Sequence, residues 1–396
     1  MAVMRGRQFF QNPGPTNIPD RILRAMDRPV LDFMGAEFRA IAEACTDGLR
    51  RILKTEHAVV SYAASGHGAW EAALVNVLSP GDRVLALESG YFSAGWGTLC
   101  QKLGLVPEVL ATDWRRGADA AAVEARLKAD RAHTIKAVLL VQNETSTGIA
   151  NDVPAVRRAL DRAEHPALFM VDVISSLGSY DFRMDDWRVD VVVAGSQKGL
   201  MLPSGMSYTG ASEKALAAVE RATMPRGYWD WRPLLSGKRQ ARFHGTAPVH
   251  FFFGLREAIA MLEEEGLDQV FARHHRLAEA TRAAVRAWRR NDGPELFALD
   301  PQRVSDSVTA VQLPEGHDAE TVRRIALERF NVSLGAGLGP LQGRVFRIGH
   351  MGDLNEPMIL GALAAVEMSL ELAGVPHAKG GVAAAMASLT AVARAA

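Results

Sequence analysis

One lysine stands alone in an apolar stretch near the middle of the chain. The segment 191–212, VVVAGSQKGLMLPSGMSYTGAS, contains Lys198 as its only charged residue, directly after an apolar run. Most lysines extend their amine to solvent along an apolar stem, and this is the ordinary alternative. Because the neighbours of Lys198 are apolar or small, we expect partial desolvation, which lowers the proton affinity of an amine. Such an amine can attack an aldehyde and form a Schiff base.

A carboxylate occupies a similar position on the preceding apolar run. Asp172 ends the run 167–171, and a buried charge without a partner is costly. One alternative is that Asp172 caps a helix beginning near Ile174. The other is that it pairs with a protonated pyridine nitrogen and holds the ring cationic, so that the ring can accept electrons. Asp172 and Lys198 together therefore predict pyridoxal phosphate better than either residue does alone.

A candidate phosphate site lies earlier in the chain. Ser65, Gly66, His67 and Gly68 follow the apolar run 58–63 and precede a helical pattern. Small residues let backbone N–H groups approach an anion, and a helix N-terminus favours negative charge. A dinucleotide fingerprint fails here because Glu71 stands where its third glycine would be, which disfavours a nicotinamide dehydrogenase.

Arg347 is a candidate for binding a carboxylate. It lies within a predicted strand, 344–348, between apolar neighbours. An exposed strand arginine is the alternative. A planar guanidinium can hold a substrate carboxylate through two hydrogen bonds and fix an amino acid for reaction.

These residues need a scaffold that brings strand ends together. Short apolar runs alternate with helical patterns, which is typical of an α/β fold with a mostly parallel sheet between helices. The predicted strands are 83–89, 136–143, 167–173 and 189–196, and the helices between them include 116–129 and 152–164. In such a fold, functional residues gather at the carboxyl ends of the strands.

The second part of the chain predicts a smaller α+β domain. Long helices are expected over 254–290, broken near Gly266, with His274 and His275 on an exposed face. Further predicted elements are a strand at 307–313, helices at 318–330 and 356–373, and a terminal segment, 378–396, that is either a docked helix or frayed. We expect a large cofactor-binding domain over 1–265, including an N-terminal arm, and a small domain over 266–396.

Composition narrows the class of protein. The chain has 396 residues, is 48% hydrophobic and has a formal net charge of zero, so it can bury a large core and nothing attracts nucleic acid. Two distant cysteines, Cys45 and Cys100, exclude a disulfide framework and favour a reducing compartment. No signal peptide, membrane span or HExxH metal motif is present. We expect a cytoplasmic protein without a metal site or a membrane partner.

Several motifs together resemble the class V aminotransferases of fold type I, specifically the serine/alanine–glyoxylate branch. The resemblance covers nearly the whole chain and looks closest to serine–glyoxylate aminotransferases. Its motifs are Asn12-Pro-Gly-Pro-Thr16, Ser65-Gly-His67, Asn143-Glu-Thr-Ser-Thr-Gly148, Val171-Asp-Val173, Gly195-Ser-Gln-Lys-Gly199 and Arg347-Ile-Gly-His350, with further agreement at 181–185 and 255–258.

The resemblance implies a role for each matching residue. Lys198 would carry the cofactor and move the proton between the substrate Cα and the cofactor, and Asp172 would hold the pyridinium. Arg347 would bind the substrate carboxylate. The remaining cofactor contacts would come from Ser65, Gly66, His67 and Gln197 at the phosphate, Thr145 at the phenolic side of the ring, Phe92 on the ring face and Thr246 at the phosphate of a neighbouring subunit.

Two departures from the family pattern concern the cofactor contacts. Trp96 competes with Phe92 for the ring face, because some relatives stack a tryptophan there. Some relatives also place a tyrosine where Phe243 stands, and phenylalanine cannot donate a hydrogen bond to a phosphate. The contact from Thr246 implies an obligate homodimer.

The expected reaction is transfer of an amino group from a small L-amino acid to glyoxylate, giving glycine, in two half-reactions. Serine is the first candidate donor and alanine is possible. Aspartate would need a second cation, for which Arg226, Lys238, Arg242, His67 and His244 are candidates. The alternatives are a cysteine desulfurase-like lyase, for which both cysteines lie too early in the chain, and a scaffold without catalytic activity.

Overall fold

The computed structural model describes residues 6–236 and 243–393. In this part of the chain, seven strands form the larger sheet. Its strands are, in spatial order, β2 (Ala58–Tyr62), β10 (Ser207–Ala211), β9 (Val191–Gly195), β8 (Leu168–Asp172), β5 (Ile135–Val141), β3 (Arg83–Glu88) and β4 (Val106–Ala111). Only β10 runs antiparallel to its neighbours within this described sheet. The predicted mostly parallel sheet is therefore confirmed.

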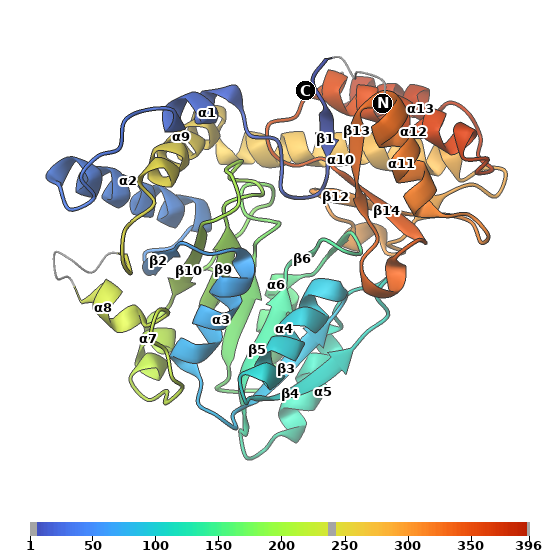
Figure 1. Ribbon diagram of the computed structural model, residues 1–396. Coiled ribbons are helices and arrows are strands. Elements are labelled where there is room, and N and C mark those ends of the chain that lie inside the picture. The colour runs from blue at the N-terminus through green and yellow to red at the C-terminus, as the bar shows by residue number, and fades with distance from the viewer. Residues whose placement is uncertain (1–5, 237–242, 394–396) are drawn as a thin grey trace.

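Helices cover both faces of the large sheet (Figure 1). Alternate residues of β5 face opposite cores, since Val138 and Leu140 pack on one side and Ala137 and Leu139 on the other. Burial on both faces explains why the central strands read as continuous apolar runs. The first face is covered by α2 (Ala36–Leu53), α5 (Ala120–Ala129), α6 (Val153–Arg162) and α9 (Val249–Glu265), and the second by α3 (Gly66–Val77), α4 (Tyr91–Lys102) and α7 (Glu213–Val219).

A smaller sheet forms the second structural centre. Its strands are, in spatial order, β1 (Phe9–Gln11), β13 (Val332–Ala336), β14 (Val345–Gly349), β12 (Val308–Gln312) and β11 (Glu295–Leu296). Around it lie α10 (Leu267–Trp288), α11 (Ala319–Phe330), α12 (Glu356–Leu372) and α13 (Gly381–Ala393). Strand β1 pairs in parallel with β13, so residues 9–11 lie within the sheet that the C-terminal part of the chain builds.

The remaining elements connect these two centres. They are α1 (Asp20–Met26), α8 (Trp231–Leu235), the short ribbon of β6 (Asn143–Glu144) and β7 (Ile149–Ala150), and 3₁₀ turns at Pro301–Arg303 and Gly339–Leu341. Helices α9 and α10 follow one another across the top of Figure 1 and carry the chain from the large sheet to the small one. Gly266, at their junction, has a φ of 83°, which a glycine adopts without strain.

The predicted elements agree closely with the observed ones. Each predicted strand and helix named above has a counterpart whose ends differ by only a few residues. The alternative of a frayed terminus is wrong for the described residues up to 393, since α13 packs with Ala385 and Leu389 buried against α10 and α12. The division into 1–265 and 266–396 stays a prediction.

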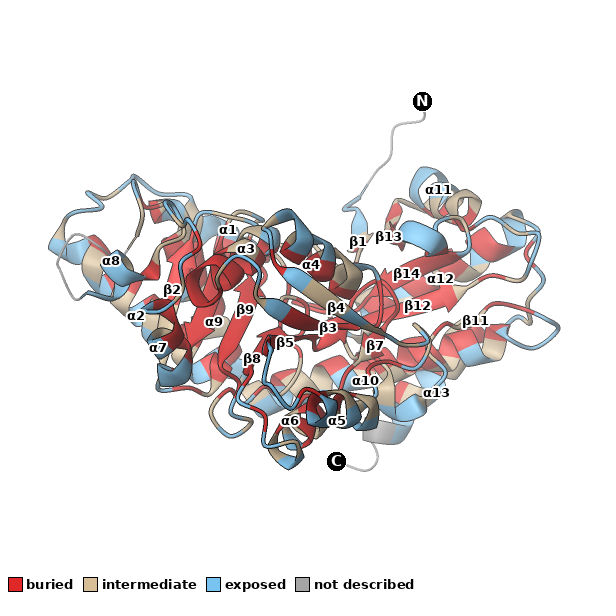
Figure 2. Ribbon diagram, turned by 90° about the horizontal axis from the view of Figure 1, so that it is seen from below, coloured by how far each residue is buried: buried red, intermediate tan, exposed pale blue. Residues whose placement is uncertain are grey.

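One expected surface position is wrong. His274 is 1% exposed, because α10 turns it inward, where its Nδ1 lies 2.7 Å from the Val270 carbonyl and its Nε2 accepts from the Gly352 N–H. Only His275 is exposed, as predicted. Figure 2 shows the general pattern, with buried strands in red and the exposed residues on the outer faces of the helices.

No helix among the described residues combines the length and the hydropathy that crossing a membrane requires.

Candidate active site

A pocket of about 220 Å³ lies at the carboxyl ends of the parallel strands of the large sheet. This is where ligands bind in open α/β sheets. Its walls come from the β2–α3, β3–α4, β8 and β9 connections, and Gly14-Pro15 of the N-terminal segment closes one side. The lining residues are Gly14, Pro15, Ser65, Gly66, His67, Trp70, Phe92, Val141, Asn143, Thr145, Asp172, Ile174, Ser175, Gln197, Lys198 and Ser204.

Lys198 lies in this pocket, three residues after β9 ends. It is 8% exposed, and its amine donates to the Pro13 carbonyl at 2.6 Å. Burial lowers the pKa of Lys198 to about 7, and the nearby positive charge of Arg347 also lowers it. The negative charge of Asp172 acts in the opposite direction and raises it. About half of the amine is therefore unprotonated at pH 7 and available as a nucleophile, whereas an ordinary lysine is almost fully protonated there.

The N-terminal segment fits closely against this lysine. Gly14 has a φ of 121°, and a Cβ at this position would lie 2.2 Å from the Lys198 Nζ. Glycine is required here for two reasons, since a side chain would be strained by the backbone and would also occupy the space of the lysine.

Asp172 ends β8, the strand that pairs in parallel with β9. Its Oδ1 accepts from the Ile174 N–H at 2.7 Å and its Oδ2 from the Trp70 Nε1 at 2.6 Å. Burial raises the pKa of Asp172 to about 7, although these two hydrogen bonds lower it. The carboxylate thus forms the local turn to Ile174 and also faces the pocket.

The start of α3 presents backbone N–H groups to the pocket. Ser65 precedes the helix in an extended conformation, and the first N–H groups of a helix have no partner within it. A Cβ on Gly66 would lie 2.3 Å from the Ile174 Cδ1, so the closeness of the helix to the β8 turn requires glycine. Gln197 contributes a buried side-chain oxygen that has no hydrogen-bond partner among the described residues.

Phe92, and not Trp96, lines the pocket. Trp96 is 1% exposed and stacks on Trp70, with ring centroids 5.7 Å apart and planes 12° from parallel. The Phe92 N–H donates to the Glu144 carboxylate at 3.3 Å, which holds the first turn of α4 in place. Thr145 also lines the pocket, where its hydroxyl donates to the Ser175 hydroxyl at 2.7 Å.

Arg347 lies on β14 of the small sheet, beside this pocket. It is 7% exposed, and its Nε and Nη1 donate to the carbonyls of Ala336 and Thr145 at 2.7 and 3.0 Å. Burial lowers the pKa of Arg347 to about 10, so it stays charged at neutral pH. Its Nη2 makes no hydrogen bond with the described residues and can donate to an anion.

Thr246 is exposed and does not line the pocket of its own chain. Of the candidates for a second cation, Arg226 donates to the carbonyls of Asn76 and Val219, and the His244 ring lies 2.8 Å from the Asp230 carbonyl. Lys238 and Arg242 lie outside the described residues. His67 alone of these candidates lines the described pocket.

Several residues that build the site have no role that was predicted from the sequence. These are Pro13, Gly14, Trp70, Asn143, Glu144, Ile174 and Ser175. The motifs 12–16 and 143–148 already contained four of them as matches to a family pattern. For Trp70, the sequence signal for a place in the site was weaker: its position one helical turn after Gly66.

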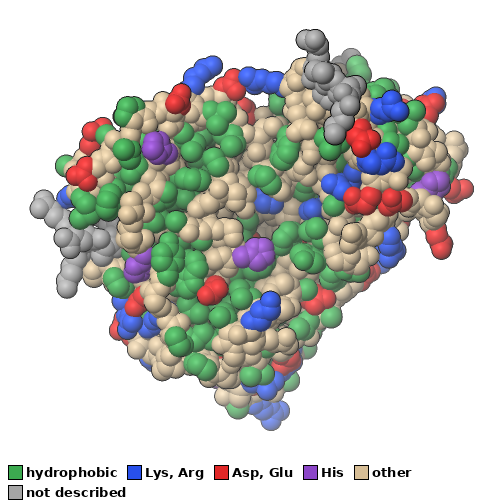
Figure 3. Space-filling model, in the orientation of Figure 1, with side chains coloured by type: hydrophobic (Ala, Val, Ile, Leu, Met, Phe, Trp, Pro, Cys, Tyr) green, Lys and Arg blue, Asp and Glu red, His purple; other side chains and the backbone are tan. Residues whose placement is uncertain are grey.

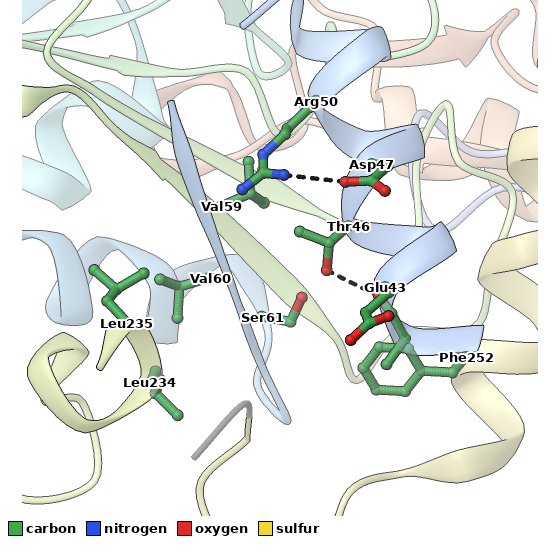
Figure 4. Close-up of a pocket in the computed structure, with 11 residues that line it drawn as sticks. Glu43, Thr46, Asp47, Arg50, Val59, Val60, Ser61, Leu234, Leu235 and Phe252 are labelled. Atoms are coloured by element: carbon green, nitrogen blue, oxygen red, sulfur yellow. Dashed lines mark hydrogen bonds and ion pairs between the residues drawn. The ribbon is translucent and has the colours of Figure 1, made fainter. Parts of the chain in front are cut away.

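A second pocket, of about 530 Å³, lies away from these groups (Figure 4). Its walls come from α2, β2, α8 and Phe252 of α9. Arg50 and Asp47 form an ion pair along α2 at 3.0 Å, and the Thr46 hydroxyl donates to the Ala42 carbonyl. None of the predicted site residues line this pocket.

The described site fits pyridoxal phosphate. A buried amine of low pKa can bond its aldehyde, a buried carboxylate can hold its ring nitrogen, and a helix N-terminus with an unpartnered Gln197 oxygen beside it marks a polar corner for its phosphate. The fold and the site thus define an enzyme that depends on pyridoxal phosphate.

Comparisons with known proteins give the family. Residues 8–342 match the model of the class V aminotransferases, and the chain belongs to that family. It is 46% identical to the L-aspartate–glyoxylate aminotransferase of Paracoccus denitrificans (strain Pd 1222), with 94% of each chain covered. It is also 46% identical to the serine–glyoxylate aminotransferase of Methylorubrum extorquens, with 98% of each covered. The crystal structure of ureidoglycine–glyoxylate aminotransferase from Bacillus subtilis superimposes with a TM-score of 0.89 at 27% identity, covering 98% of this chain and 99% of that one.

Proposed function

We propose that this enzyme transfers the amino group of a small L-amino acid to glyoxylate, which yields glycine. The observation that carries the proposal is the buried amine of Lys198 and the buried carboxylate of Asp172 in one pocket, with the guanidinium of Arg347 beside it. The relatives named for glyoxylate transamination support the acceptor.

Pyridoxal phosphate, when bound, supplies an aldehyde that condenses with amines and a ring that accepts electrons from the substrate Cα. Lys198 would hold the cofactor between turnovers and then act as the base that takes the proton from the substrate Cα. Its pKa of about 7 suits an acid–base group, since it can both accept and return a proton near neutral pH.

Asp172 would hold a proton on the ring nitrogen through an ion pair inside the protein. Ser65, Gly66, His67 and Gln197 would bind the phosphate at the start of α3. Phe92 would cover a face of the ring, and Thr145 would lie at its phenolic side.

Arg347 would bind the substrate carboxylate. Two of its nitrogens are already fixed to backbone carbonyls, one on β13 and one on the β6 side of the pocket, so the guanidinium is oriented before substrate arrives. An arginine fixed in this way loses little entropy when it forms a further hydrogen bond.

We propose serine as the preferred donor. Among the described residues that line the pocket, Lys198 is the only lysine or arginine, and Arg347 beside it is assigned to the α-carboxylate, so only His67 is left in this lining to attract the side-chain carboxylate of aspartate. The hydroxymethyl group of serine needs no second cation.

Initial-rate assays test both parts of the proposal. Purified holoenzyme is given glyoxylate with serine, alanine or aspartate, and kcat/KM for glycine formation is compared. Serine should give the highest value. A higher value with aspartate would contradict the donor, and activity with another 2-oxo acid but none with glyoxylate would contradict the acceptor.

A lyase acting through a nucleophilic cysteine is disfavoured. Cys45 and Cys100 are buried, burial raises the pKa of both thiols to about 12, and neither lines the pocket. A thiol in such surroundings is a poor nucleophile. Two free thiols also suit a reducing cytoplasm, which we propose as the location.

We also propose that the enzyme works as a homodimer in which Thr246 reaches the phosphate site of the other subunit. Large hydrophobic side chains are exposed on the segments before α2 and around α8, namely Val30, Phe33, Met34, Tyr228 and Leu235. Hydrophobic side chains are numerous on the left and central part of the face in Figure 3, where α2, α3 and α9 lie. Exposed apolar surface of this kind is typical of an interface between subunits.

A further inference from the structure

The environment of the Asp172 carboxylate contains a donor that the roles above leave unexplained. Its Oδ2 accepts from the indole Nε1 of Trp70 at 2.6 Å, and its Oδ1 accepts from the Ile174 N–H at 2.7 Å. Both donors are neutral. Among the described residues, Lys198 is the cation that attracts Asp172, and neither hydrogen bond to the carboxylate comes from a charged group. The carboxylate, which lines the pocket, therefore remains available to pair with a cation bound there.

Trp70 is held rigidly in the position from which it donates. It lies on α3, one turn after the helix begins, and is 2% exposed. The Trp96 ring stacks on it at 5.7 Å, and the His67 ring lies 4.5 Å from it at a tilt of 53°. The same side chain lines the pocket. An indole fixed in this way can set the orientation of the carboxylate that it contacts.

Trp70 and Trp96 differ in the hydrogen bonding of their indole N–H groups. The Trp96 Nε1 is buried without a hydrogen-bond partner among the described residues, whereas the Trp70 Nε1 donates to a carboxylate. A buried indole N–H usually finds a hydrogen-bond partner. The polar contact thus gives Trp70 a function beyond packing.

We propose that Trp70 is a positioning residue, whose indole N–H fixes the Asp172 carboxylate toward the ring nitrogen of the cofactor and keeps it ionised there. The inference rests on the proposed function, since it requires the cofactor ring to face Asp172. A hydrogen bond to an ionised acceptor is stronger than one between neutral groups, so the indole favours the carboxylate over the carboxylic acid. The proton of the ion pair then stays on the ring.

Loss of the indole N–H has a predictable effect on the cofactor. Asp172 becomes more basic, the shared proton moves toward it, and the ring carries less positive charge. The nitrogen of Lys198 then binds its proton more tightly, because a nearby positive charge no longer repels that proton. Binding of the cofactor weakens for the same reason, since the ion pair that holds the ring is weaker.

The test compares Trp70→Phe with Trp96→Phe, which removes an indole of the same size from the same stack but breaks no hydrogen bond. Two quantities are measured for each: the Kd of pyridoxal phosphate for the stripped protein by equilibrium dialysis, and the pH midpoint of the absorbance change of the bound cofactor. For Trp70→Phe we expect a Kd raised about tenfold or more and a midpoint raised by about one pH unit. For Trp96→Phe we expect a Kd within about twofold of the parent value and a midpoint within about 0.2 pH units of the parent midpoint.

The Asp172→Asn variant tests whether Trp70 acts through Asp172. If Trp70 acts through Asp172, Trp70→Phe should add no further shift of the pH midpoint to a protein that already carries Asp172→Asn. Equal shifts in the two tryptophan variants, or additive shifts in the double variant, would overturn the inference and leave the proposed function intact. A parent enzyme that forms no absorbance band with pyridoxal phosphate would overturn the proposed function itself.

Discussion

The amine of Lys198 is buried, and we expect this to make the stability of the cofactor-free protein depend on pH. The pKa of Lys198 falls from 10.5 in the unfolded chain to about 7 in the folded one, chiefly because of burial. Between these values the unfolded state binds more protons than the folded state, so stability should rise with pH by up to about 1.4 kcal/mol per unit.

Replacement of the lysine by an uncharged side chain should remove that dependence. We expect Lys198→Met to flatten the rise in the free energy of unfolding between pH 7 and 10, measured by urea denaturation of stripped protein. Lys102→Met, on the exposed end of α4, is the matched control and should keep the rise. The assignment of the low pKa to Lys198 fails if the slope is the same in both variants.

Arg347 makes a second prediction at the residue scale. Lysine at this position keeps the charge, but its compact ammonium lacks the planar fork with which Arg347 reaches two backbone carbonyls and keeps further donors for a carboxylate. Arg347→Lys should therefore lower kcat/KM for the amino donor by about 10- to 100-fold, mainly through KM. The absorbance of the bound cofactor should not change.

Arg344 serves as the control for that substitution. It is exposed and directly precedes β14, so Arg344→Lys should leave the kinetics within about twofold of the parent. Equal losses in both variants would show that a cation near this strand matters, and not the fixed guanidinium of Arg347.

At the scale of elements, the N-terminal segment completes the pocket. Gly14 has a φ of 121° and a Cβ there would overlap the Lys198 side chain. Gly14→Ala should thus lower cofactor affinity and kcat/KM by about tenfold or more, because the lysine must move.

Gly81→Ala is the control for backbone strain in the absence of a clash with another side chain. Its φ is 85°, and a Cβ there meets nothing within 4 Å. Gly81→Ala should cost about 1 kcal/mol of stability, as strained glycine sites do, with unchanged kinetics. Thermal unfolding and steady-state kinetics of both variants check the comparison, which fails if Gly81→Ala loses activity as Gly14→Ala does.

The elements themselves could largely be predicted because burial on both faces leaves continuous apolar runs. The apolar runs predicted strands β3, β5, β8 and β9. They also placed Asp172 and Lys198 at or just after the ends of strands. The pairing of β1 with β13 was not predicted, because it joins segments more than 300 residues apart that carry no shared pattern. The contact of Trp70 with Asp172 was hidden for the same reason, since it spans two elements whose distance only the fold sets.

At the scale of the whole molecule, the site draws on both sheets. Lys198 and Asp172 come from the large sheet and Arg347 from the small one, while the N-terminal segment crosses between them. Burial is the main cause of the lowered pKa of Lys198, and the charge of Arg347 on the small sheet adds to it.

The proposed dimer makes a prediction at this scale. Sedimentation should give a mass close to twice 42.9 kDa. Thr246→Val should raise the Kd of pyridoxal phosphate by about tenfold, because a hydroxyl donor to the phosphate is lost. Thr98→Val, at an exposed position on α4, is the control. A monomer with full activity would contradict the proposal.

The central claim is that Lys198 forms the covalent bond to the cofactor. Holoenzyme is reduced with sodium borohydride, digested, and the modified peptide is located by mass spectrometry. We expect the pyridoxyl group on Lys198, in the peptide that contains Gly195-Ser-Gln-Lys-Gly199. A label on another lysine, or no label on a protein that has bound the cofactor, would contradict it.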